Sequence, residues 1–209
     1  MTLATDSNAR LEFDPVIVRT HFGDDLTWEA VKRMLTPPEE DEGGVPVFVD
    51  DPRWENADTD TVLVAVATGE IPAVAVVFLA DQITMETDHH ALVVATTLTR
   101  EECDDEQQWE YETEFGRQFR AVPETVLDIQ VNMELANMDF PDFSSVAYKD
   151  PEGIYRRTSE AAASESSLHE RAADELSLDA EPASMPPESG ASACYSARVA
   201  AVRAVTAEE

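Results

Sequence analysis

The segments AVAVVFL at Ala73–Leu79 and ALVVATTL at Ala91–Leu98 are continuous apolar runs. A run of this length without alternation between polar and apolar residues is typical of a strand that is buried on both faces of a sheet. Both are also short enough to be strands rather than buried helices. We therefore expect them to be neighbouring central strands with helices on either side.

Three further segments carry strand signals. The segment Pro15–Thr20 is β-branched and begins with proline, and Val45–Val49 ends at Asp50-Asp51-Pro52. Arg117–Val122 alternates polar and apolar residues, as a half-exposed strand does. Together with the two apolar runs, these segments predict about five strands.

Helix signals separate the early strands. Asp24 or Asp25 can cap a helix that ends near Leu35, and the acidic start of residues 58–68 with Gly69 behind it favours a helix over a strand. Pro123 opens a third helix over residues 124–136, and a short fourth helix is expected at residues 141–148. In the first helix we expect a shared apolar face formed by Leu26, Val31, Met34 and Leu35. The order of these elements predicts an α/β fold, a single mixed β-sheet of about five strands covered by helices.

The composition changes near Arg157. Residues 157–209 contain 14 alanines and 9 serines but no Phe, Trp or Ile, and such a segment buries too little apolar area to offset the entropy of ordering. We therefore expect a flexible N-terminus over residues 1–14, an α/β domain over 15–156 and a disordered Ala/Ser/Glu-rich C-terminal tail over 157–209.

The chain carries a formal net charge of −30, with 44 acidic and 14 basic side chains. This charge repels nucleic acids and anionic lipid surfaces, so neither is an expected partner, whereas a basic protein is. Adaptation to a high-salt cytoplasm would explain the same charge without a partner. The polar N-terminus and the two cysteines, Cys103 and Cys194, indicate a cytoplasmic location, and no apolar run is long enough to span a membrane.

Three blocks of sequence resemble a family of uncharacterised bacterial proteins known as a domain of unknown function. The first reads VIVRTHFGDD at residues 16–25 and is followed by Trp28-Glu29, and the second reads FVDDP at residues 48–52. The third combines GRQFRAVP at residues 116–123 with ANMDF at residues 136–140. The resemblance covers about residues 15–156 and implies one compact α/β domain, without an established activity.

Two pairs of polar residues are candidate metal or carboxylate sites. His89 and His90 follow two acidic residues and could ligate a divalent ion, although adjacent side chains on an extended chain point to opposite sides. Asp50 and Asp51 follow a predicted strand, where α/β proteins often place ligand groups. The same pair could instead end the strand and cap the turn at Pro52.

The segment Thr99–Glu114 holds eight acidic residues together with aromatic ones. It is either a solvated acidic insertion or a docking surface for an arginine-rich partner, in which Trp109, Glu110, Tyr111 and Glu112 would make ion pairs and cation–π contacts. In the peptide Asn137–Phe140, Asn137 suits the end of one helix and Asp139 the cap of the next.

The sequence contains no P-loop, nucleophile elbow, dinucleotide fingerprint or metalloprotease motif. The leading hypothesis is a cytoplasmic acidic protein-interaction module of the inhibitor or immunity type, with no cofactor. The alternative is a small enzyme or metal-binding protein with a site around Asp50 and Asp51, joined by His21 or His89. The sequence leaves the oligomeric state open.

Overall fold

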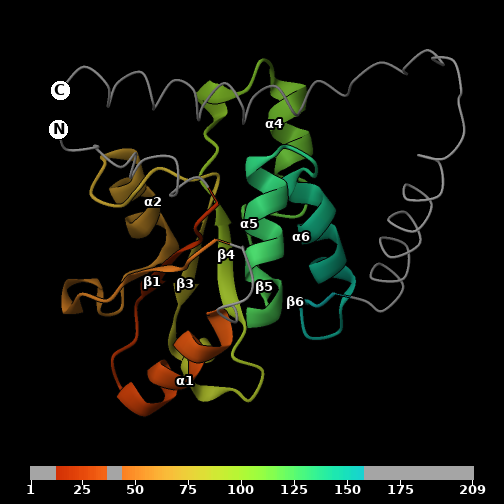
Figure 1. The fold of residues 1–209 in the computed structure, drawn as a ribbon. Helices are drawn as coiled ribbons and strands as arrows, with labels where there is room; N and C mark the ends of the chain where they lie inside the picture. Colours follow the sequence, from red (N-terminus) through yellow and green to blue (C-terminus); the bar gives the residue numbers. More distant parts are fainter. Residues whose placement is uncertain (1–12, 37–43, 158–209) are drawn as a thin grey trace, which may run out of the picture.

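The two apolar runs form β3 (Val76–Ala80) and β4 (Leu92–Thr96), which pair antiparallel in the middle of one mixed sheet. The computed structural model describes residues 13–36 and 44–157, and the predictions for the N-terminus and the tail fall largely outside them. Figure 1 shows the sheet, whose strand order is β2-β1-β3-β4-β5-β6. The other strands are β1 (Val16–Arg19), β2 (Val47–Val49), β5 (Gln118–Ala121) and β6 (Ile154–Tyr155).

The α/β architecture is confirmed, with one strand more than the five expected. The additional strand, β6, has only two residues and pairs parallel with β5 at the edge of the sheet. A segment this short has no periodicity of its own, so the neighbouring strand and helix determine its conformation. All strands except β4 run in the same direction, because β4 is antiparallel to both of its neighbours.

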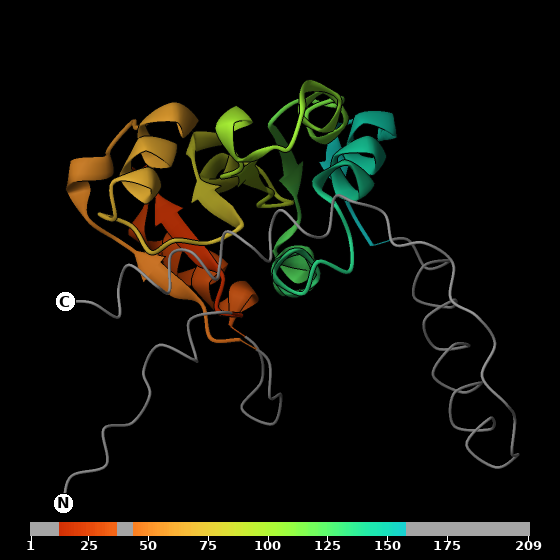
Figure 2. The ribbon, with the colours of Figure 1, turned by 90° about the horizontal axis from the view of Figure 1, so that it is seen from above.

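Helices cover both faces of the sheet. Alternate residues of β3 belong to two different apolar clusters: Val77 packs with α2, whereas Phe78 packs with α1, α5 and α6. Figure 2 shows α2 on one side of the sheet, and α1 and α5 on the other. The helices are α1 (Asp25–Leu35), α2 (Thr59–Ala67), α3 (Gln82–Glu86), α4 (Glu106–Glu112), α5 (Val126–Glu134) and α6 (Phe140–Lys149).

The expected apolar face of α1 is wrong in part. Leu26 is 84% exposed and Met34 is exposed too, whereas Trp28, Val31 and Leu35 are buried. At about 100° per residue, Leu26 and Met34 lie away from the stripe formed by the other three. The capping prediction is confirmed, since Asp24 accepts hydrogen bonds from the N–H groups of Leu26 and Thr27.

The later helices differ in detail from their predictions. Pro123–Thr125 forms a 3-10 turn before α5 begins at Val126. After α5 it is Ala136, not Asn137, that adopts the left-handed conformation, with φ of 51°. Asp139 does cap α6, in a reciprocal capping box with Asp142.

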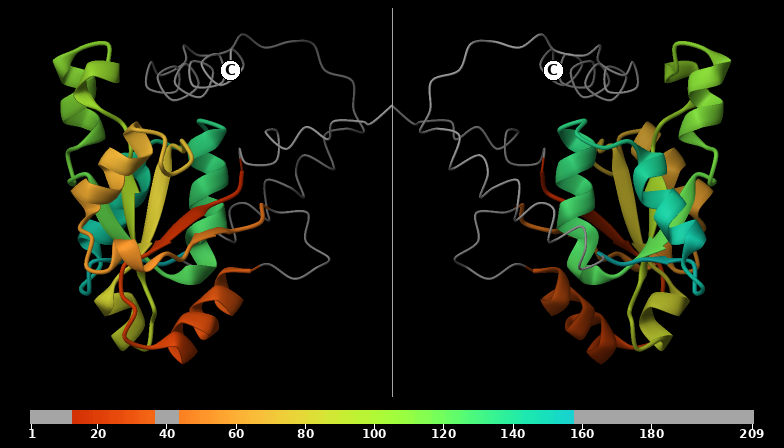
Figure 3. Two further views of the ribbon diagram at one scale, coloured as in Figure 1. Left: turned by 90° about the vertical axis from the view of Figure 1, so that its left-hand side faces the viewer. Right: turned by 90° about the vertical axis from the view of Figure 1, so that its right-hand side faces the viewer.

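Two short helices, α3 and α4, were not expected. Each begins at an aspartate, Asp81 or Asp105, whose carboxylate accepts a hydrogen bond from a backbone N–H in the first turn. α4 lies beyond the ends of the strands, at the opposite end of the sheet from α1 (Figures 1 and 3).

Within the described residues, no helix combines the length and the apolar character that crossing a lipid bilayer requires.

Candidate functional site

The carboxyl ends of the five parallel strands share one edge of the sheet, and β4 begins at this same edge. Ligand sites in α/β proteins often lie at such an edge. Arg19 ends β1, Asp50 follows β2, Asp81 follows β3, and the turn with His89 and His90 precedes β4. The sequence-predicted metal and carboxylate candidates therefore lie along one edge.

Arg19 is the centre of the first polar group at this edge, although it is only 4% exposed. Its guanidinium donates to Asp25 Oδ1 at 2.7 Å and to Asp50 Oδ1 at 3.3 Å. Its Cζ atom lies 4.4 Å from the centroid of the Phe22 ring and 5.4 Å from that of Trp28. A buried guanidinium needs such partners, because an unpaired buried charge is strongly destabilising. Arg19 thereby ties the start of α1 to the end of β2.

The two aspartates after β2 have different partners within the chain. The indole Nε1 of Trp28 donates to Asp50 Oδ2 at 2.7 Å, in addition to the contact from Arg19. Asp51 caps the turn at Pro52 by accepting from the backbone N–H of Arg53 at 3.0 Å, as one of the two open interpretations predicted. The other interpretation, a carboxylate site around Asp50 and Asp51, stays a prediction.

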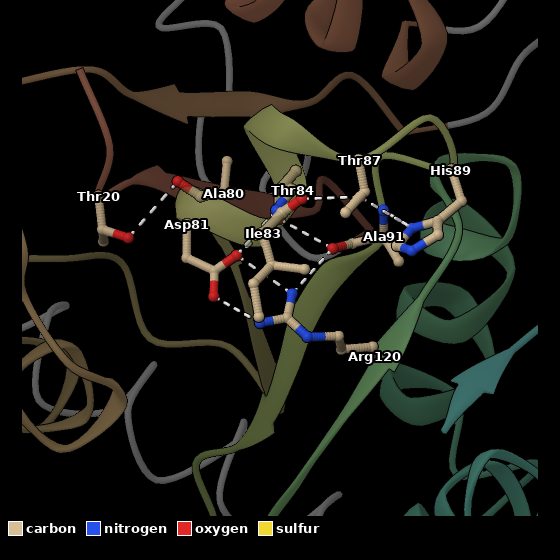
Figure 4. A network of polar contacts seen from close by, with 9 residues as sticks. All are labelled: Thr20, Ala80, Asp81, Ile83, Thr84, Thr87, His89, Ala91 and Arg120. Carbon is tan, nitrogen blue, oxygen red and sulfur yellow. Dashed lines mark hydrogen bonds and ion pairs between the residues drawn. The ribbon is translucent and has the colours of Figure 1, made fainter. Parts of the chain in front are cut away.

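A second polar group joins β3, α3, β4 and β5 (Figure 4). Arg120 donates to both carboxylate oxygens of Asp81, at 2.5 and 3.1 Å, and to the carbonyl of Ala91 at 3.0 Å. Asp81 Oδ1 also accepts from the backbone N–H of Thr84. Burial acts to raise the pKa of Asp81, but the hydrogen bonds from Arg120 and Thr84 outweigh it, and the pKa lies below its usual value.

The two histidines use their Nδ1 atoms within the turn before β4. His89 Nδ1 accepts from the N–H of Ala91 at 3.0 Å, and His90 Nδ1 lies 2.9 Å from the Thr84 carbonyl. His90 has a φ of 46°, in the left-handed region, at the end of the turn before β4. Across residues 13–36 and 44–157, no group of three or more His, Cys, Asp or Glu side chains is arranged to hold a metal ion.

The predicted partner-binding residues lie at the other end of the sheet, on α4. Glu110 and Tyr111 are exposed, the latter by 44%. Trp109 is half-buried, and the Arg117 guanidinium lies 5.5 Å from its ring centroid. Glu112 is only 1% exposed, so its carboxyl group does not belong to the surface as the sequence reasoning expected. The segment is a helix, and consecutive residues of a helix face different directions.

Four further residues lie beside the exposed part of α4; Glu114 belongs to the segment expected to bind a partner, and the other three were not expected to take part. Tyr148 on α6 is 74% exposed, and its ring lies 5.5 Å from that of Phe115. Burial raises the pKa of Tyr111, and nearby carboxylates, among them the exposed Asp142 and Glu114, add to the effect. Tyr148 could have been found as an aromatic residue outside the buried stripe of α6. We call Tyr111, Glu114, Phe115, Asp142 and Tyr148 the α4–α6 surface.

Glu112 lies beneath this surface in an unusual environment. Both of its carboxyl oxygens are buried without a hydrogen-bond partner among the described residues. Burial, helped by the negative charges of Asp139 and Asp142, raises the pKa of Glu112 to about 7. The pKa of Asp139 is raised as well, by burial and by Asp142. A carboxyl group in such surroundings favours its neutral form.

Comparison with known proteins supports the resemblance seen in the sequence. Neither a curated protein nor a solved structure matches the chain. A family model does match residues 14–158, which include nearly all of the described residues and both ends of the sheet. Over these residues the chain belongs to the family described as Domain of unknown function (DUF6924).

Proposed function

We propose that this chain is a protein-interaction module of the inhibitor or immunity type, which binds a basic, arginine-containing segment of a partner protein through the α4–α6 surface. The observation that carries the proposal is the pair of exposed tyrosines, Tyr111 and Tyr148, in a setting of carboxylates. A cytoplasmic location is part of the same proposal, and it rests on the two cysteines of the sequence, which form no disulfide framework.

The chemistry of the surface favours arginine over other residue types. The face of an aromatic ring attracts a guanidinium group, and a carboxylate accepts two parallel hydrogen bonds from it. Trp109 and Arg117 show this pairing within the chain. The exposed ring of Tyr148, which packs against the half-buried Phe115, can accept a guanidinium from a partner in the same way, with Glu114 and Asp142 as ion-pair acceptors. Lysine stacks less well on a ring and cannot form the bidentate contact.

The test is the affinity of the full chain for a labelled arginine-rich peptide at 0.15 M salt, measured by fluorescence anisotropy. We expect Tyr148→Ala to weaken binding roughly threefold and Tyr111→Ala with Tyr148→Ala roughly tenfold, since an exposed cation–π contact contributes about 0.5–1 kcal/mol. A peptide with lysine in place of arginine should bind more weakly than the original.

Matched control variants distinguish binding at the α4–α6 surface from nonspecific electrostatic attraction between an acidic protein and a cationic peptide. Leu26→Ala removes an exposed apolar side chain at the other end of the sheet, and Asp60→Asn removes one exposed charge on α2. Both should leave the affinity within a factor of about two, whereas Glu114→Gln should lower it further than Asp60→Asn. Equal losses in the control variants and in the α4–α6 variants would contradict the proposal.

A further inference from the structure

α4 is anchored in a way that is uncommon for a short helix. Of its seven residues, only Glu112 is fully buried. Short helices are usually held by apolar side chains, because isolated helices of this length are marginal in water. The fully buried residue of α4, a helix that contacts α6, is instead an acid.

The surroundings of Glu112 disfavour its ionised form. The groups that act on it from α6 are the carboxylates of Asp139 and Asp142. Tyr111 on its own helix and Glu114 just after it are also acidic groups. Of the nearby cations, Arg117 lies over the Trp109 ring and donates to the carbonyl of Leu98, and Arg100 pairs with Glu106 in the first turn of α4. An ionised Glu112 would therefore be buried without a hydrogen bond and beside like charges.

Other polar groups of the same two helices also lack partners. Gln108 lies one helical turn before Glu112, and its Nε2 atom is buried without a hydrogen bond among the described residues. The same is true of Ser144 Oγ on α6. Each buried polar group without a partner costs free energy, which opening the contact to water recovers. Both helices therefore carry buried polar groups whose exposure to water would recover free energy, as local opening requires.

We propose that Glu112 couples the docking of α4 on α6 to proton binding, so that the helix is docked when this carboxyl group is neutral and leaves the interface when the group is ionised. The carboxyl group of a glutamate in water has an ordinary pKa of 4.5, against about 7 for Glu112 in the docked state. The docked state therefore binds the proton more tightly, and a fall in pH favours docking whereas a rise in pH favours opening.

This inference deepens the proposed function, and rests on it for its biological meaning, because Tyr111 belongs to α4 and Tyr148 to α6. With α4 docked, the two residues lie on one surface; with α4 undocked, that surface is divided. Binding of an arginine-rich partner should therefore be tighter at pH 6 than at pH 8.5. The docking equilibrium itself does not depend on whether such a partner exists.

The test is hydrogen–deuterium exchange of the full chain at pH 5.5 and pH 8.5, corrected for the intrinsic pH dependence of amide exchange. In the wild-type protein we expect the opening of Glu106–Glu112 to increase by more than tenfold between the two pH values. Val126–Glu134 in α5 is the internal reference and should keep its protection. Glu112→Gln retains the size of the side chain without the charge and should keep α4 docked at both pH values.

Glu110→Gln is the matched control, because Glu110 is exposed on the same helix. This variant should show the pH dependence of the wild type. Protection of α4 that is independent of pH in the wild type would overturn the proposal, and so would a pH dependence that survives in Glu112→Gln. Peptide binding that is absent at every pH, with the exchange result as expected, would contradict the proposed function alone.

Discussion

Replacing Asp81 with alanine should destabilise the domain by about 3 kcal/mol, because this carboxylate performs two separable tasks. It caps α3 by accepting from the backbone N–H of Thr84, and it forms a bidentate ion pair with Arg120. Loss of a helix cap costs about 1 kcal/mol. The ion pair has side-chain exposures of 29% and 21%, which places it between exposed pairs at about 0–1 kcal/mol and buried pairs at about 3–5 kcal/mol.

Conservative variants measure separately what the helix cap and the ion pair each contribute to the free energy of unfolding. Asp81→Asn keeps a good helix cap and loses the charge, so it should cost about 2 kcal/mol. Arg120→Met should cost at least as much, because it also removes the donor to the Ala91 carbonyl. The double variant Asp81→Asn with Arg120→Met should recover about 1.5 kcal/mol relative to the sum of the single variants.

The measurement is the free energy of unfolding from urea titrations at pH 7, with the m-value as the check on two-state behaviour. Since the pKa of Asp81 is lowered from 3.8, the stability that it contributes is present at neutral pH and is lost as the pH falls below about 3.8. This loss should be absent from Asp81→Asn. Equal destabilisation by Asp81→Ala and Asp81→Asn would refute the capping argument, and a coupling energy below about 0.5 kcal/mol would refute the ion-pair argument.

Three further predictions concern the core, the edge of the sheet and the overall charge. Val76→Asp and Val93→Asp place a charge in opposite faces of the sheet, and each should prevent cooperative folding as judged by thermal unfolding, because an unpaired buried charge costs several kcal/mol. Trp28→Phe removes the hydrogen bond to Asp50 and should lower the free energy of unfolding by about 1.5–2 kcal/mol in urea titrations. The thermal midpoint should rise clearly between dilute buffer and 1 M KCl, because residues 1–156 carry 34 acidic and 10 basic side chains whose repulsion is screened; a flat response would show that the charges are locally paired.

The candidate site was predictable only in part. Asp50 and Asp51 were selected from their place after a strand, and His89 and His90 as metal-ligand types that follow two acidic residues; all four lie at one edge of the sheet. The sequence could not show that Arg19 and Trp28 contact Asp50, because 31 and 22 residues separate these partners in the chain. For the α4–α6 surface the acidic segment was recognised, but its helical conformation was not.

The sequence by itself determined the features that depend only on residues close together in the chain. The apolar runs of β3 and β4, the cap of α1 at Asp24 and the cap of α6 at Asp139 all follow from short-range sterics and hydrogen bonds, which any chain with these residues experiences. Only the tertiary structure decided which polar groups are enclosed. Glu112 is buried and Glu110 is exposed on the same helix, because α6 covers one side of α4 and water the other. Burial of a polar group depends on surfaces that folding brings together from distant parts of the chain, and the residues next to that group in the sequence do not predict which surfaces these are.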